Sequence, residues 1–332
     1  MTVALFTLGG TIAMAGHSAG AGGGPVVTRL TGAELTAAVP GLADLGVALD
    51  VRDAHAVPSA DLSFRHLLDL VDAASRAVAD GARGVVVTQG SDTLEETAFL
   101  VDLVWPHPEP FVLTGAMRNP TLAGPDGPAN LLAAARVAAS PAARELGALV
   151  VLNDEIHSAR WVRKTHSTST ATFASPNLGP LGQVIEGRVR ILARPERREP
   201  PLARPAAARL DAIRVALHTV TLDDDGADLG RLADTHHGLV VAGFGVGHVP
   251  SALAPVLGAL AERIPVVLTS RSGSGSVLRH TYGAIGSETD LQRRGLLNGG
   301  LLDPYKARVL LRLLLAAGAD REAVTAAFAR HA

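Results

Sequence analysis

The sequence predicts an α/β protein in which a doubly wound, parallel-sheet N-terminal domain is followed by a smaller α/β C-terminal domain. Short apolar runs alternate with loops and helical segments, the pattern of a parallel sheet covered by helices. Three predicted strands end in loops of small and polar residues, Gly9–Thr11, Gln89–Thr93 and Gly115–Arg118. Parallel strands share a carboxyl edge where ligands bind, so these loops are expected to open at one edge.

The first element is the apolar run Val3–Phe6, which leads into Gly9, Gly10 and Thr11. A short run of β-branched and aromatic residues bounded by glycines predicts a buried strand. Adjacent glycines allow a turn that substituted residues could not make, and they let a ligand approach the backbone. The Thr11 hydroxyl would then be free at the sheet edge. The alternative is that the glycines only make a turn and Thr11 only caps it.

The next stretch, Ala15–Pro25, is rich in glycine and has no periodicity. Its position directly after the predicted site favours a mobile lid. A disordered surface insertion is the alternative.

The rest of the N-terminal domain continues the alternation. Thr31 and Glu34 fit a capping box before a short helix that ends near Pro40. The further predicted strands are Val47–Val51, Gly84–Thr88, Phe111–Thr114 and Leu146–Asn153. The further predicted helices are Ser63–Asp80, Leu94–Val104 and Asn130–Ser140, and the loop Ala56–Asp61 precedes the first of them.

A change of composition marks the domain boundary. Pro195–Ala208 is proline-rich and charged, which predicts an irregular interdomain linker. The predicted division is an N-terminal domain over 1–194, a linker over 195–210 and a C-terminal domain over 211–332. The C-terminal domain is predicted to contain the strands Ile213–Val220, Gly238–Ala242 and Val266–Ser270, and the helices Ser251–Arg263, Lys306–Gly318 and Arg321–Arg330.

The composition excludes several classes of protein. The 332 residues are 47% hydrophobic, enough for a large core, and 30 Lys and Arg balance 32 Asp and Glu. Balanced charge and only 3% aromatic residues argue against a nucleic-acid partner. Apolar runs fall short of the ~20 residues of a membrane span. The N-terminus lacks the basic and apolar segments of a signal peptide. The predicted location is therefore the cytoplasm, unless a leader has been removed.

Cofactor chemistry is not indicated. Without cysteine the chain has no disulfide, thiolate metal site or cysteine nucleophile. The 12 histidines do not form a His-Glu-x-x-His pattern, and neither a Walker loop nor a dinucleotide fingerprint is present. No metal and no organic cofactor is expected.

Four residues near the predicted edge could together perform acyl transfer: Thr11, Ser91, Asp92 and Lys164. A hydroxyl is a poor nucleophile without a base. A partly desolvated lysine holds its proton less tightly, so Lys164 could take a proton from Ser91, Thr11 or water. Asp92 could orient Lys164 or hold a substrate ammonium group. Backbone N–H groups near Gly10 and Ser91 could stabilise an oxyanion. Taken singly, Lys164 could be a surface lysine and Asp92 a helix N-cap.

The chain resembles the bacterial-type L-asparaginases, the asparaginase/glutaminase family with a threonine nucleophile, nearly from end to end. The resemblance rests on matching motifs at Leu8–Ala13, Val87–Ala98, Thr114–Arg118, Lys164–Thr165, Ala171–Phe173, Gly179–Gly182 and Asp303–Arg308. It implies an L-asparagine amidohydrolase that forms aspartate and ammonia, with glutamine as a minor substrate. It also implies a homodimer or homotetramer whose sites are shared between subunits.

The resemblance assigns roles residue by residue. It implies that Thr11 is the nucleophile and that Ser91, Asp92 and Lys164 handle protons. The substrate-binding residues that it implies are Gly10, Ser59, Gly90, Ala116 and Glu288. Ser59 would bind the α-carboxylate, the Ala116 carbonyl would accept from the amide, and Asp92 would also contact the α-ammonium group. Glu288 would be lent by the neighbouring subunit.

The chain departs from the family pattern at several positions. Ser91 replaces a threonine, which keeps the hydroxyl and loses a methyl group. Ala60 stands where Gln or Glu is frequent, so the preference for asparagine over glutamine is open. His248, Val249 and Pro250 replace an Asn-rich stretch. The predicted lid has no tyrosine, and we expect Tyr282, near Glu288, to replace the lid tyrosine from the partner subunit; a tyrosine that only fills the interface is the alternative.

Two other functions remain open at this point. One is the amidase subunit of a tRNA-dependent amidotransferase, although such subunits generally carry an extra N-terminal domain. The other is an amino-acid-binding regulator on the same fold, although binding alone would not require Lys164. Ammonia release from asparagine and glutamine by the purified chain distinguishes the three.

Overall fold

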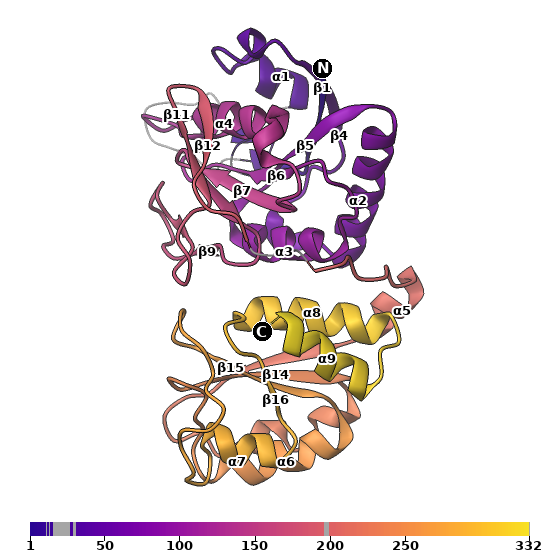
Figure 1. Cartoon of the computed structure of the whole chain (residues 1–332), viewed down its shortest axis with the longest axis vertical. Helices are drawn as coiled ribbons and strands as arrows, with labels where there is room; N and C mark the ends of the chain where they lie inside the picture. Colours follow the sequence, from indigo (N-terminus) through magenta and orange to yellow (C-terminus); the bar gives the residue numbers. More distant parts are fainter. Residues whose placement is uncertain (11, 13, 16–26, 29–30, 196–198, 332) are drawn as a thin grey trace. The chain divides into compact units, whose positions relative to one another are not determined.

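The structure is a computed structural model that describes residues 1–332 except 11, 13, 16–26, 29–30, 196–198 and 332 (Figure 1). The chain divides into two compact units, Met1–Pro201 and Leu202–Ala332. The division falls inside the predicted linker 195–210. The helix α5 (Ala207–Ala212) begins within this range as well, so the irregular segment is shorter than its composition predicts.

The first unit is built on an eight-stranded sheet with the order β12-β11-β8-β7-β6-β5-β1-β4. The five strands from β4 to β7 are parallel, whereas β8, β11 and β12 run antiparallel to their neighbours. Its strands are β1 (Thr2–Thr7), β4 (Ala48–Asp53), β5 (Ala82–Thr88), β6 (Phe111–Thr114), β7 (Ala148–Leu152), β8 (Glu155–Ser158), β11 (Gly182–Ile185) and β12 (Arg188–Ile191). The predicted α/β class with a mainly parallel N-terminal sheet is confirmed.

Helices cover the parallel strands. Four helices belong to this part of the described chain: α1 (Gly32–Ala37), α2 (Phe64–Ala79), α3 (Leu94–Val104) and α4 (Gly127–Ala139). A core cluster joins α1 and α4 to alternate strand residues such as Val86, Val112 and Leu149. The helices α2 and α3 contact each other and the same strands. Burial of both faces explains why β1, β5, β6 and β7 read as largely apolar runs, whereas the edge strand β4 contains Asp50 and Arg52.

Two-residue ladders complete the unit. The strand β2 (Met14–Ala15) pairs with β3 (Val27–Thr28), and β9 (Arg163–Lys164) pairs with β10 (Phe173–Ala174), both antiparallel. Of the predicted lid Ala15–Pro25, Ala15 belongs to β2 and the other residues lie outside the described part of the chain.

The second unit has a four-stranded parallel sheet with the order β13-β14-β15-β16. Its strands are β13 (Val215–Thr219), β14 (Gly238–Gly243), β15 (Val266–Ser270) and β16 (Leu297–Asn298). Its helices are α5, α6 (Leu253–Arg263), α7 (Glu288–Arg293), α8 (Pro304–Ala316) and α9 (Arg321–His331). Figure 1 shows α6 and α7 on one face of this sheet and α8 and α9 on the other. A core cluster packs Leu253, Leu257 and Leu291 against alternate residues of β14 and β15.

Helices in the part of the chain described here are all too short or too polar to cross a bilayer.

Candidate active site

The site begins where β1 ends. Gly9 and Gly10 adopt φ angles of +91° and +89°, a region that L-residues with a side chain rarely enter. The chain turns here against the segment that follows β4, and the backbone N–H of Val57 donates to the Leu8 carbonyl at 3.3 Å. Thr11, the predicted nucleophile, lies outside the described residues.

Two glycines bring the first two loops into backbone contact. A Cβ placed on Gly10 would lie 2.2 Å from the backbone N of Gly90. A Cβ on Gly90 would in turn lie 2.7 Å from Oγ of Ser59. Ser59, which begins the 3-10 turn Ser59–Asp61, is buried. The structure therefore brings together three of the predicted substrate-binding residues, Gly10, Gly90 and Ser59.

Lys164 reaches the same group of loops from β9. Its Nζ donates to Ser91 Oγ at 3.0 Å and to Asp92 Oδ1 at 2.7 Å. Ser91 and Asp92 follow β5 in the 3-10 turn Ser91–Thr93. The lysine side chain is 15% exposed, whereas that of Asp92 is 72% exposed and can be reached by a ligand. An amine thus lies between a buried hydroxyl and an accessible carboxylate.

Hydrogen bonds inside the loops hold Ser59 in place. The buried amide of Gln89 donates through Nε2 to Thr93 Oγ1 at 3.2 Å, and Thr93 Oγ1 donates to the Ser59 carbonyl at 3.0 Å. The loop after β4 is therefore tied to the loop after β5 through side chains as well as through the close glycine contact.

The third loop follows β6 and contains the predicted residue Ala116, which is buried. Asp126 accepts from the backbone N–H of Met117 and Arg118 at 2.8–3.0 Å. Asn130 Nδ2 donates to the Gly115 carbonyl at 3.0 Å. Since Asp126 and Asn130 sit at the start of α4, this helix fixes the backbone on both sides of Ala116.

The helix α4 begins three residues before its predicted start at Asn130. Asp126 is its N-cap and Pro128 occupies one of its first positions. Proline is favoured there because its fixed φ suits a helix and its missing N–H has no intrahelical partner to bond.

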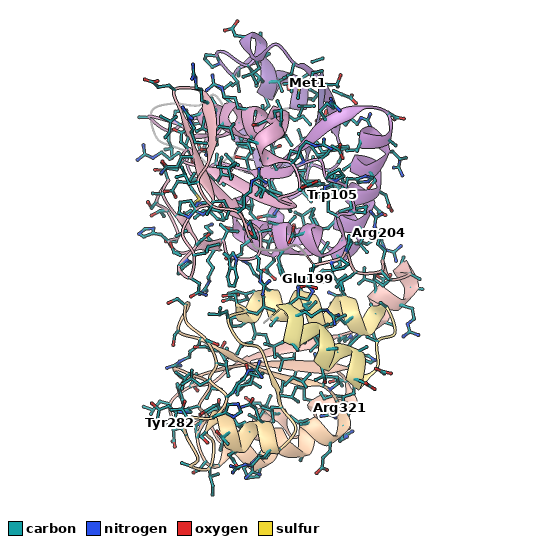
Figure 2. The ribbon with its side chains drawn as sticks, viewed as in Figure 1. Met1, Trp105, Glu199, Arg204, Tyr282 and Arg321 are labelled. Atoms are coloured by element: carbon teal, nitrogen blue, oxygen red, sulfur yellow. The ribbon has the colours of Figure 1, made fainter. Side chains whose placement is uncertain are left out.

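Tyr282, labelled in Figure 2, belongs to the second unit, and its backbone contacts the Glu288 side chain. Glu288 is fully buried, and its Oε1 accepts from the backbone N–H of Tyr282 at 2.7 Å and of Thr281 at 2.9 Å. Oε2 pairs with His248 Nε2 at 3.2 Å. Burial raises the pKa of Glu288, but the bonds from Tyr282, Thr281 and His248 outweigh it and leave the pKa below its usual value. Tyr282 is 48% exposed and packs edge-to-face on His248.

Several residues of the site's framework were not singled out from the sequence. Glu95 accepts from the Lys164 backbone, and Gln89, Thr93, Asp126 and Asn130 fix the loops. Glu95 gave one signal, because it stands three and four residues before Ala98 and Phe99 and so shares the apolar face of the predicted helix. Asp126, Gly127 and Pro128 gave another, since an acidic residue before Gly-Pro is typical of a helix start.

The arrangement suits acyl transfer. A lysine that contacts both a hydroxyl and a carboxylate can pass a proton between them. Backbone N–H groups at the Gly10–Gly90 contact are the kind of donors that stabilise an oxyanion. Across the described ranges, no three His, Asp or Glu side chains are close enough to hold a metal ion.

The two-unit α/β architecture and the lysine–serine–aspartate cluster define the candidate site of an enzyme suited to acyl transfer. The first unit matches the family profile described as "Asparaginase, N-terminal" over residues 2–197, and the second matches "Glutaminase/Asparaginase C-terminal domain" over residues 214–328. The chain belongs to the asparaginase family.

Individual relatives agree over nearly the whole chain. An L-asparaginase of Bacillus licheniformis is 35% identical over 323 residues, 95% of each chain. L-asparaginase 2 of Escherichia coli K12 is 32% identical over 336 residues, 99% of this chain and 93% of that one. The crystal structure of a probable cytoplasmic L-asparaginase from Campylobacter jejuni superposes with a TM-score of 0.85 at 32% identity, covering 98% of both chains.

The close approach of the Gly10 and Gly90 backbones predicts that a larger residue at position 10 lowers the stability of the first unit. We expect Gly10→Ala to destabilise the first unit by about 3 kcal/mol, because the new methyl group would meet the Gly90 backbone and the positive φ would be strained. Urea denaturation measures this loss. Gly81→Ala is the matched control: Gly81 has φ +103° but nothing within 4 Å of an added Cβ, so it should lose only about 1 kcal/mol. Equal losses in the two variants would contradict the steric argument.

Proposed function

We propose that this protein is an L-asparagine amidohydrolase that hydrolyses the side-chain amide of asparagine to aspartate and ammonia. Family membership, and near-complete coverage of relatives named L-asparaginase, support this function. The observation that carries it is the placement of Lys164 Nζ between Ser91 Oγ and Asp92 Oδ1, at 3.0 and 2.7 Å. An amino-acid-binding regulator would need the carboxylate but not the lysine–hydroxyl contact.

The proposed reaction has two steps. The Thr11 hydroxyl attacks the amide carbon, the C–N bond breaks, and ammonia leaves with the proton that Thr11 gave up. Water then attacks the resulting ester and releases aspartate and the free hydroxyl. Lys164 and Ser91 carry the protons in both steps. The backbone around Gly10 and Gly90 stabilises the oxyanion, and the Ala116 carbonyl accepts a hydrogen bond from the amide.

Substrate binding is proposed to use the remaining residues near these loops. Ser59 binds the α-carboxylate, and Asp92, whose side chain is accessible, binds the α-ammonium group. The next residue after Ser59 is Ala60, which offers no polar atom beyond its backbone. We expect asparagine to be the main substrate and glutamine a minor one.

The decisive experiment is ammonia release from asparagine and from glutamine by the purified chain without a partner protein. Turnover of asparagine supports the proposal, with Thr11→Ala as the negative control. Binding of the amino acid without ammonia release would instead identify a regulator. Ammonia release that depends on an added protein partner would identify an amidotransferase subunit.

The proposal extends to assembly and location. We propose a homodimer or homotetramer in which Glu288, with Tyr282, is lent to the site of a neighbouring subunit. Light scattering measures the mass of the assembly, and a monomer with full activity would contradict site sharing. We propose a cytoplasmic location, which is supported by the Campylobacter relative described as probable cytoplasmic.

Tyr282 is proposed to supply the hydroxyl that the predicted lid, which has no tyrosine, does not contain. We expect Tyr282→Phe to lower kcat for asparagine about tenfold, since it removes only the hydroxyl and leaves the ring on His248 and the backbone bond to Glu288. Tyr305, the other of the chain's two tyrosines, is 43% exposed in the first turn of α8, and Tyr305→Phe is the matched control. Unchanged turnover in Tyr282→Phe would refute the role.

A further inference from the structure

One short stretch of chain, residues 91–95, contacts both the backbone and the side-chain amine of Lys164. Its ammonium group contacts Ser91 and Asp92, and its backbone N–H donates to Glu95 Oε2 at 2.9 Å. Ser91 and Asp92 lie in the 3-10 turn that runs directly into α3, and Glu95 lies in the first turn of that helix. Residues 91–95 therefore hold the backbone of the lysine and also supply the two groups that its amine contacts.

We propose that Glu95 is a positioning residue for Lys164, acting through its hydrogen bond to the Lys164 backbone N–H. This inference rests on the proposed function, because it concerns the lysine assigned to proton transfer there. Glu95 is assigned no contact with substrate.

The short ladder that contains Lys164 gives the Lys164 backbone N–H no acceptor of its own. The strands β9 and β10 pair over only two residues, with Lys164 opposite Phe173. The neighbouring pair is the hydrogen-bonded one, since Thr165 N–H donates to the Thr172 carbonyl at 2.8 Å. Residues along an antiparallel strand alternate in direction, so the Lys164 N–H points away from β10. Glu95 provides the acceptor on that side.

The Glu95 side chain makes its bond to the Lys164 backbone from a buried position. Glu95 is 7% exposed, although acidic residues in the first turn of a helix are commonly solvated. Loss of the acceptor would leave a partly buried N–H unpaired, which favours a shift of the backbone over an unmade bond. A shift of β9 would move Nζ away from Ser91, and proton transfer is sensitive to such displacements.

A simpler explanation is that Glu95 only interacts favourably with the dipole at the N-terminus of α3. That role requires a negative charge and no particular partner. The bond to Lys164 requires an acceptor oxygen and no charge. Glutamine keeps the oxygen and removes the charge, so the two explanations predict opposite results for Glu95→Gln.

The experiment compares Glu95→Leu and Glu95→Gln by steady-state kinetics on asparagine. We expect Glu95→Leu to lower kcat about 100-fold with little change in KM, because the substrate-binding residues keep their places. We expect Glu95→Gln to retain kcat within about threefold of the wild type, because the amide oxygen still accepts from Lys164. Glu96→Leu, at the next carboxylate of the same turn, is the matched control and should leave kcat unchanged.

Two kinetic results would overturn the proposal. One is a wild-type kcat in Glu95→Leu. The other is an equal loss of kcat in Glu95→Gln and Glu95→Leu, which would assign the effect to charge.

Hydrogen exchange of the Lys164 amide gives a readout that does not depend on catalysis. We expect the amide to exchange faster in Glu95→Leu than in the wild type, and to stay protected in Glu95→Gln and Glu96→Leu. This remains measurable if the wild type fails to hydrolyse asparagine, which would reject the proposed function alone. If exchange is the same in all four proteins, the positioning role is rejected whatever the activity. If Glu95→Leu fails to fold, Glu95→Gln still tests the proposal through its kcat and the exchange rate of its Lys164 amide.

Discussion

Thr11→Ala is expected to lower the turnover of asparagine by more than about 10⁴-fold, at least about 5 kcal/mol of transition-state stabilisation. The variant removes the proposed nucleophile and leaves Gly10 with its close backbone contact to Gly90. Folding and assembly should therefore be retained. Ammonia release gives the loss of activity, and urea denaturation verifies the fold.

Ser91 is the hydroxyl that competes with Thr11 for this role, because Lys164 Nζ lies 3.0 Å from its Oγ. The two assignments differ in where the acyl group is trapped. Quenching the reaction and mapping the acylated peptide should identify the peptide that contains Thr11, and Ser91→Ala should reduce the rate of trapping without moving the label. An acyl group on Ser91, or near-wild-type turnover in Thr11→Ala, would make Ser91 the nucleophile.

Lys164→Met is expected to lower kcat for asparagine by about 10³-fold, the range of a lost general acid–base group. Methionine occupies a similar volume and keeps the apolar part of the side chain, but it cannot bridge Ser91 and Asp92. KM should change less than kcat, because Ser59 and the accessible carboxylate of Asp92 remain. Steady-state ammonia release over a range of asparagine concentrations separates the two constants.

Lys164→Arg separates proton transfer from simple charge. Arginine preserves the positive charge beside Asp92 but stays protonated in proteins, so it cannot accept a proton from Ser91. We expect this variant to be nearly as impaired as Lys164→Met. A kcat for Lys164→Arg within about threefold of the wild type would show that the charge alone is needed.

Most of the parallel half of the first sheet was predictable because β1, β5, β6 and β7 are largely apolar, and a glycine follows β1, β5 and β6 within two residues. Val3–Phe6 and Gly84–Thr88 lie within the observed strands β1 and β5. Parallel topology then places their loops at one edge. That argument, together with the resemblance to the asparaginases, led to the expectation that Lys164, Ser91 and Asp92 would meet. The structure brings them together, with Lys164 on β9 rather than at the end of a parallel strand.

The antiparallel part, from β8 to β12, was not predictable from local pattern. The strands β9 and β10 have two residues each, too few to show a period, and β12 alternates Arg188 and Arg190 with apolar residues at an exposed edge. In the second unit, β16 also has only two residues, too few to show a period. These segments are strands because of the neighbours with which they pair, and that information is not local.

The framework of the site was harder to predict than its reactive groups. Reactive residues occur in recognisable motifs, whereas Glu95 contacts a residue 69 positions away along the chain. A glutamate in the first turn of a helix is typically explained by the helix dipole. The hydrogen bond to the Lys164 backbone depends on where the fold places β9, which the local sequence does not show.

The three glycines at the ends of β1, β5 and β6 limit how this protein can change its substrate. An added methyl group would come within 2.2 Å of backbone at Gly10, 2.7 Å of Ser59 at Gly90 and 2.5 Å of the Gln89 carbonyl at Gly115. The base of the proposed amide-binding site is thus main chain, and a larger residue at any of these three positions would displace its neighbours. Under the proposed substrate assignment, acceptance of a longer amide would have to come from side chains around these glycines, and Ala60, next to Ser59, is the first position to vary.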